Sequence, residues 1–185
     1  MNNILKPESL THLELNDELL EYKRMLDKSV NENSNWPIFN EGKEHAAILM
    51  ATIFDCAKEY VYLYCNALNP QLSSIDMYYD ALEKCIQRGV PIRLALQSQD
   101  ALDVNNPAIN LIQNSDKNKV VVLTEENDNL LKSNLNNMEI HFAVSDDKRY
   151  RMEYDKTNMK AISSFNDEKV ALTLKKAIEP VFTNL

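Results

Sequence analysis

Residues 81–96 read ALEKCIQRGVPIRLAL, and this stretch decides the fold. Its first half carries apolar residues at helical intervals, and Gly89 can end the helix because glycine readily adopts the left-handed conformation at a helix C-terminus. The apolar segment 91–96 that follows is typical of a strand. A second such segment, YVYLYC at residues 60–65, precedes a helix predicted over 75–88. The sequence therefore predicts a β-α-β unit with parallel strands and a right-handed crossover.

Further helices and strands are predicted on both sides of this unit. Apolar periodicity predicts helices over 13–27, 43–58 and 108–113, and a final helix that begins at Asn166 or Asp167. Alternating or β-branched residues predict strands over 119–124, 139–145, 149–154 and 160–165, with a hairpin turn at Asp146-Asp147. The polar segment 125–137 indicates a loop or a weak helix. Strand 119–124 is expected to be buried on both faces, because its apolar character is continuous.

This order of elements indicates an α/β fold with a mixed, largely parallel central sheet flanked by helices on both faces. The length of 185 residues fits a single structural domain. We expect residues 1–42 to form an N-terminal helix and a lid segment, centred on Trp36-Pro37-Ile38-Phe39, that pack on an α/β domain of residues 43–185.

Composition narrows the class of partner. The net charge of −8 and the pI of about 4.9 repel a phosphate backbone, so we do not expect nucleic-acid binding. The longest apolar run is too short to span a membrane. Three cysteines without a CxxC pair, and histidines without ligand spacing, favour free thiols and argue against a metal site. These features predict a cytoplasmic protein without a cofactor and without membrane association.

Two segments in the last third carry a family resemblance. HFAVSDDKRYRMEYD begins at His141, and AISSFND begins at Ala161. Together with the turn Arg88-Gly89-Val90, they make residues 43–185 resemble one half-module of the phospholipase D superfamily. In that superfamily a strand carries the motif His-x-Lys-x4-Asp, and a Gly-Ser-x-Asn element follows it. The resemblance implies the phospholipase D-like fold.

The resemblance also implies that the catalytic motif is incomplete. His141 matches the nucleophilic histidine, but Ala143 stands at the lysine position and Lys148 at the aspartate position. Ser163-Ser164-Phe165-Asn166 is similar to the second element with its glycine replaced. A histidine that attacks phosphorus needs cations to stabilise the oxyanions and a carboxylate to hold its tautomer. No catalytic residue is therefore assigned, and His141 is the candidate.

Candidate binding residues follow from the same segments. Strand alternation places Arg149, Arg151 and Glu153 on one face, where the guanidinium groups could hold a phosphate or a partner carboxylate. The alternative is that they form ion pairs with one another or with the aspartates of the Asp146-Asp147 turn. Further candidates for contact with a ligand or partner are Ser164, Asn166 and Trp36.

Three functions are compatible with these residues. We favour a non-catalytic binding or assembly module with a protein partner, either as a homodimer or within a larger complex. The resemblance suggests a bacterial complex, with anti-phage defence as one setting. The first alternative is a phosphodiesterase or nuclease that uses His141 with Arg149 or Arg151. The second is a sensor of a small phosphate-containing ligand.

Overall fold

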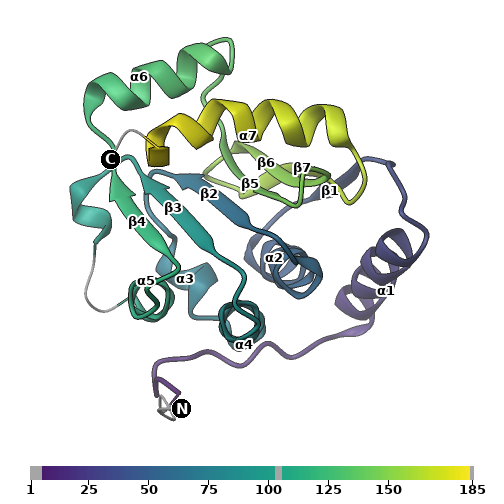
Figure 1. Cartoon of the computed structure of the whole chain (residues 1–185). Coiled ribbons are helices and arrows are strands. Elements are labelled where there is room, and N and C mark those ends of the chain that lie inside the picture. Colours follow the sequence, from purple (N-terminus) through teal and green to yellow (C-terminus); the bar gives the residue numbers. More distant parts are fainter. Residues whose placement is uncertain (1–5, 103–105, 184–185) are drawn as a thin grey trace.

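The computed structural model describes residues 6–102 and 106–183. Within them, one mixed sheet runs through the molecule in the order β1-β7-β6-β5-β2-β3-β4 (Figure 1). The strands are β1 (Ile38–Asn40), β2 (Val61–Cys65), β3 (Ile92–Leu96), β4 (Lys119–Val122), β5 (His141–Ser145), β6 (Arg149–Asp155) and β7 (Lys160–Ser164). Strand β3 pairs in parallel with both β2 and β4, which confirms the predicted β-α-β unit.

Helices cover both faces of the sheet (Figure 1). One face carries α1 (Asp17–Asn31), α2 (Lys43–Cys56), α3 (Pro70–Ser73), α4 (Asp76–Gln87) and α5 (Pro107–Gln113). The other carries α6 (Glu125–Asn134) and α7 (Glu168–Thr183), and the short 3-10 helix η1 (Gln99–Ala101) follows β3. The predicted mixed α/β architecture is confirmed. The parallel part is smaller than expected, because the pairs β1–β7, β7–β6, β6–β5 and β5–β2 are all antiparallel.

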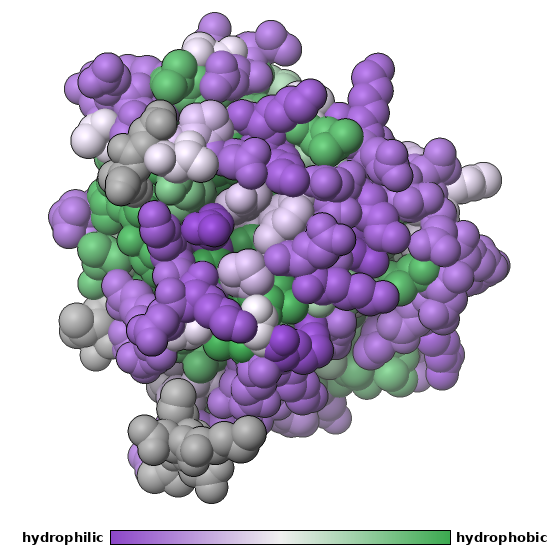
Figure 2. Space-filling model, viewed as in Figure 1, coloured by the Kyte–Doolittle hydropathy of each residue, from purple (hydrophilic) through white to green (hydrophobic). Residues whose placement is uncertain are grey.

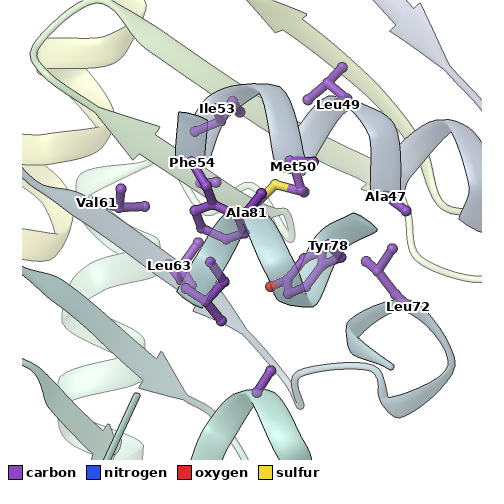
Figure 3. Packing of buried hydrophobic residues seen from close by; sticks show 14 of the residues in the cluster. Ala47, Leu49, Met50, Ile53, Phe54, Val61, Leu63, Leu72, Tyr78 and Ala81 are labelled. Carbon is purple, nitrogen blue, oxygen red and sulfur yellow. The ribbon is translucent and has the colours of Figure 1, made fainter. Parts of the chain in front are cut away.

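The larger core lies between α2, α4 and the sheet. Every residue from Ala46 to Phe54 is buried, because α2 is enclosed by its neighbours on several sides. Figure 3 shows Phe54 and Met50 of α2 close to the ring of Tyr78 from α4 and to the side chains of β2. The Phe54 and Tyr78 rings meet edge to face, with centroids 5.2 Å apart. A second cluster packs α7 against the opposite face.

Caps and turns lie where the sequence predicts them. Gly89 has φ +79°, and its N–H donates to Ile86 O at 2.8 Å, so it ends α4 in the left-handed conformation. The Asn16 side chain accepts from Leu19 N at the start of α1. Asp167 accepts from Val170 N at the start of α7. Asp146 and Asp147 both have positive φ, as the two central residues of a tight hairpin turn require.

Two local predictions are wrong, and the third, a loop or a weak helix over 125–137, is resolved in favour of the helix. Residues 38–40 form the edge strand β1, and Trp36 is 76% exposed, so this segment does not close over the core as a lid. Residues 125–134 form a regular helix, α6, whose start is capped by the Thr124 side chain. Strand β4 lies at the border of the sheet and is only partly buried, because one of its edges has no described strand beside it. None of the described helices is long and apolar enough to cross a bilayer.

Candidate functional site

A cleft of about 960 Å³ opens where β2 and β3 end and β5 begins. Parallel strands place their carboxyl ends at one edge, and open α/β sheets commonly bind ligands there. The floor of the cleft is apolar, with Met50, Leu63, Leu68, Leu72 and Tyr78. Its polar lining includes Asn66, Asn69, Gln71, Gln97, Lys132, Glu139, His141, Arg151, Glu153 and Lys156. The loop 66–71, which follows β2, forms part of this lining.

A buried polar cluster lies in the cleft. His141 of β5 faces Glu153 of β6 in the strand register, and His141 Nδ1 lies 3.0 Å from Glu153 Oε2. Arg151 Nη2 donates to Glu153 Oε1, also at 3.0 Å. The three side chains are 13% or less exposed. The structure thus brings together three of the residues that the sequence singles out, and we call them the His141–Glu153–Arg151 cluster.

Both ring nitrogens of His141 have partners within the protein. The backbone N–H of Asn66 lies 3.0 Å from His141 Nε2. Because a backbone N–H can only donate, Nε2 accepts this bond and carries no proton. The ring proton is therefore on Nδ1, which donates to the Glu153 carboxylate. The Asn66 N–H thus occupies the Nε2 lone pair of His141.

The carboxylate of Glu153 is the centre of the cluster. Burial raises its pKa, but the hydrogen bond from His141 and the charge of Arg151 outweigh burial and hold the pKa below its ordinary value. Arg151 also donates from Nη2 to Met159 O at 3.2 Å, whereas its Nε has no hydrogen-bond partner among the described residues. Ala143 lies directly opposite Arg151 in the register. The guanidinium therefore occupies a site whose charge is already neutralised.

A second network forms another wall of the cleft. Tyr64 Oη donates to Asp128 Oδ1 at 2.7 Å, and Gln97 Nε2 donates to Tyr64 Oη at 2.8 Å. Lys132 Nζ lies 2.9 Å from Asp128 Oδ2. Burial raises the pKa of Asp128, but the hydrogen bonds from Lys132, Tyr64 and Gln97 outweigh it and lower the pKa overall. These four side chains therefore form one connected polar network.

The remaining predicted residues lie away from the cleft. Arg149 Nη1 bonds Asp146 Oδ2 at 2.7 Å beside the hairpin turn, at the opposite end of β6 from Glu153. Ser164 is buried and pairs with Tyr150 near the same end. The Asn166 side chain donates to Asn33 O, and Trp36 is exposed. None of these four residues lines the cleft.

Sequence reasoning missed several site residues. Gln97 and Asp128 hold the Tyr64 hydroxyl, but neither belongs to a motif. One signal was available for Gln97, which follows directly after a buried strand, at the carboxyl edge of the sheet. Among the described residues, no group of three or more His, Cys, Asp or Glu side chains is placed to hold a metal ion.

Comparisons with known proteins bear on the fold. No protein-family model and no curated protein matches the sequence. Among solved structures, NucT from Helicobacter pylori matches with 12% identity and a TM-score of 0.58, over 80% of this chain and 95% of that one. Nuc from Salmonella typhimurium, a phospholipase D family member, matches with 12% identity and a TM-score of 0.53 over the same shares.

A third solved structure has a different function. TrmBL2, an archaeal chromatin protein with a novel mode of DNA binding, matches with 14% identity and a TM-score of 0.54. The match covers 89% of this chain but only 57% of TrmBL2. The expected absence of nucleic-acid binding therefore stays a prediction. At these identities the likeness concerns the fold alone: this chain has the fold of the phospholipase D family.

Proposed function

We propose that this protein is a non-catalytic phospholipase D-like module that binds a protein partner in the cleft. The observation that carries the proposal is the closed His141–Glu153–Arg151 cluster. The Nε2 lone pair of His141 accepts a backbone hydrogen bond, and the cation beside it, Arg151, is paired with Glu153. A phosphoryl-transfer site needs a free nucleophile and cations directed at the developing oxyanion.

The lining of the cleft supports a protein partner. Its floor offers Leu68 and Leu72, and its rim offers the carboxamides of Asn66, Asn69 and Gln71. An apolar centre with a polar rim is how protein interfaces are commonly built. Carboxamides both donate and accept, so they suit the backbone of a partner segment. The resemblance supports placing this partner in a bacterial complex, with anti-phage defence as one setting.

Variants at the rim of the cleft test this proposal. Asn66→Trp and Gln71→Trp add bulk at two exposed positions of the rim, and the first keeps the backbone N–H that caps His141. Gln87→Trp, at the exposed end of α4, is the matched control. A partner should co-purify from the native host with wild type and with Gln87→Trp, and should be lost with both rim variants. A partner that survives both rim variants would contradict binding in the cleft.

A phosphodiesterase or nuclease is the second candidate. The 3.0 Å contact between His141 and Glu153 favours it, because a carboxylate on Nδ1 is how a catalytic imidazole is oriented. Arg149 cannot contribute as the sequence suggested, since it bonds Asp146 away from the cleft. This candidate predicts hydrolysis of bis-p-nitrophenyl phosphate that disappears in His141→Ala.

A phosphate sensor is the third candidate. Lys132 and Lys156 line the cleft and could face an anion there, although Lys132 also pairs with Asp128. Inorganic phosphate should then raise the melting temperature of the wild-type protein. An equal rise in Lys156→Ala and Arg151→Ala would place the phosphate elsewhere.

A further inference from the structure

Strand β4 is the border of the sheet on the side away from β1. It pairs in parallel with β3, and no described strand lies on its outer side (Figure 1). An edge strand offers unpaired backbone groups that can pair with another chain. The outer side of β4 is therefore a candidate surface for pairing with another chain. This inference does not depend on the function proposed for the cleft.

The hydrogen bonds of β4 show which backbone groups point outward. Leu123 N donates to Leu96 O of β3 at 2.8 Å. In a strand, the backbone groups of successive residues point alternately to the two sides, so Lys119 and Val121 also face β3. The N–H and C=O groups of Val120 and Val122 therefore point away from β3, to the side on which no described strand lies.

The side chains of this edge do little to protect it. Val120, Val121 and Val122 are all partly exposed, and the register with β3 shows no bulge. Natural edge strands usually carry a proline, a bulge or an inward-pointing charge that discourages pairing. Here Lys119 is the single charge within the strand. Figure 2 shows a hydrophobic area on the side of the molecule where β4 lies in Figure 1.

Charges of opposite sign flank the two ends of β4. Lys117 and Lys119 stand at its start and are exposed, with Asp116 reducing their net charge to +1. Glu125 and Glu126 follow its end and are also exposed. In an antiparallel pair of identical strands, the start of one strand lies beside the end of the other. The basic end of one copy would then meet the acidic end of the second, so the edge is complementary to itself.

We propose that β4 is a homodimer interface in which two copies pair antiparallel about a two-fold axis at Val121. Val120 of each copy then exchanges backbone hydrogen bonds with Val122 of the other. Lys117 of each copy then lies opposite Glu125 of the other. A two-fold dimer requires such a self-complementary patch. His141 lies on β5, three strands from β4, so the two clefts stay separate and each can bind its own partner.

Proline substitution tests the backbone pairing. Val122→Pro removes an outward N–H and leaves the hydrogen bonds between β3 and β4 in place, and proline is tolerated at such edge positions. Val122→Thr keeps the N–H and a β-branched side chain, and is the control. Light scattering after size exclusion, over a concentration series, should give twice the 21.3-kDa mass for wild type and Val122→Thr, and a monomer for Val122→Pro. A monomeric wild type, or a dimer that Val122→Pro leaves intact, overturns the proposal.

Charge reversal tests the orientation and controls for misfolding. One variant carries Lys117→Glu, and the other carries Glu125→Lys. Each variant alone places like charges together and should be monomeric. An equal mixture restores both pairs of opposite charge and should dimerise, which two unfolded variants could not do. Failure of the mixture to dimerise, while both variants keep the circular dichroism of wild type, would overturn the antiparallel arrangement.

Discussion

Removal of the Glu153 carboxylate should destabilise the protein strongly. Glu153 is 8% exposed, and its oxygens accept from His141 and Arg151 at 3.0 Å each. Glu153→Leu leaves the Arg151 guanidinium, itself 5% exposed, without a counterion. Loss of one partner of a buried ion pair costs about 3 to 5 kcal/mol, because the other charge stays out of water uncompensated. We expect the free energy of unfolding to fall by that amount.

Urea unfolding followed by circular dichroism measures this loss. Glu139→Leu is the matched control, since Glu139 lines the same cleft with a side chain that is 74% exposed, and it should change stability by less than about 0.5 kcal/mol. The double variant Arg151→Met with Glu153→Leu removes both charges. It should be more stable than Glu153→Leu alone, because replacing a buried pair by apolar groups is often close to neutral. A cost of Glu153→Leu below about 1 kcal/mol would refute the description of the cluster as closed and buried.

Three further predictions follow from the same contacts. Asp146→Ala should cost about 3 kcal/mol in urea unfolding, because Asp146 pairs with the buried Arg149 and also accepts from three backbone N–H groups before β2. Stability should fall as the pH drops below about 4.5, because the pKa of Glu153 is lower in the folded protein than the ordinary value of 4.5 and the stabilisation by its carboxylate is lost on protonation. Glu153→Gln should make stability less dependent on pH in this acidic range. Burial raises the pKa of Cys85 to about 11, so iodoacetamide at about pH 8 should label this thiol only after unfolding, as mass spectrometry can show.

Local signals in the sequence were sufficient for most elements. The apolar alternation of 60–65 and 91–96, with Gly89 between them, predicted the parallel unit that the structure contains. The Asp146-Asp147 pair predicted the hairpin of β5 and β6. Residues 125–137 were predicted only as a loop or a weak helix, because few residues of α6 are apolar and only Leu131 is buried. Its regularity depends on the Thr124 cap and on packing against α7, and the second of these is not a local property of the sequence.

The pairing of the strands and the geometry of the site could not be predicted from the sequence and are known only from the structure. β5 pairs antiparallel with β2, about eighty residues away in the sequence, and nothing near either strand specifies that choice. The same pairing brings the Asn66 backbone to His141. Arg149 and Arg151 share a strand face, as alternation predicted. However, Arg149 bonds Asp146 at the hairpin turn, whereas Arg151 bonds Glu153 in the cleft. Sequence identified the residues of the cluster, and the register determined which of them meet.

The most direct test of the central claim is turnover of bis-p-nitrophenyl phosphate, measured together with the intact mass of the protein. The account predicts no nitrophenol release above that of His141→Ala and no covalent adduct, because His141 Nε2 is occupied by the Asn66 N–H and Arg151 is neutralised by Glu153. Release of nitrophenol that His141→Ala abolishes, with a phosphoryl adduct mapped to His141, would show that the site is catalytic and contradict the account.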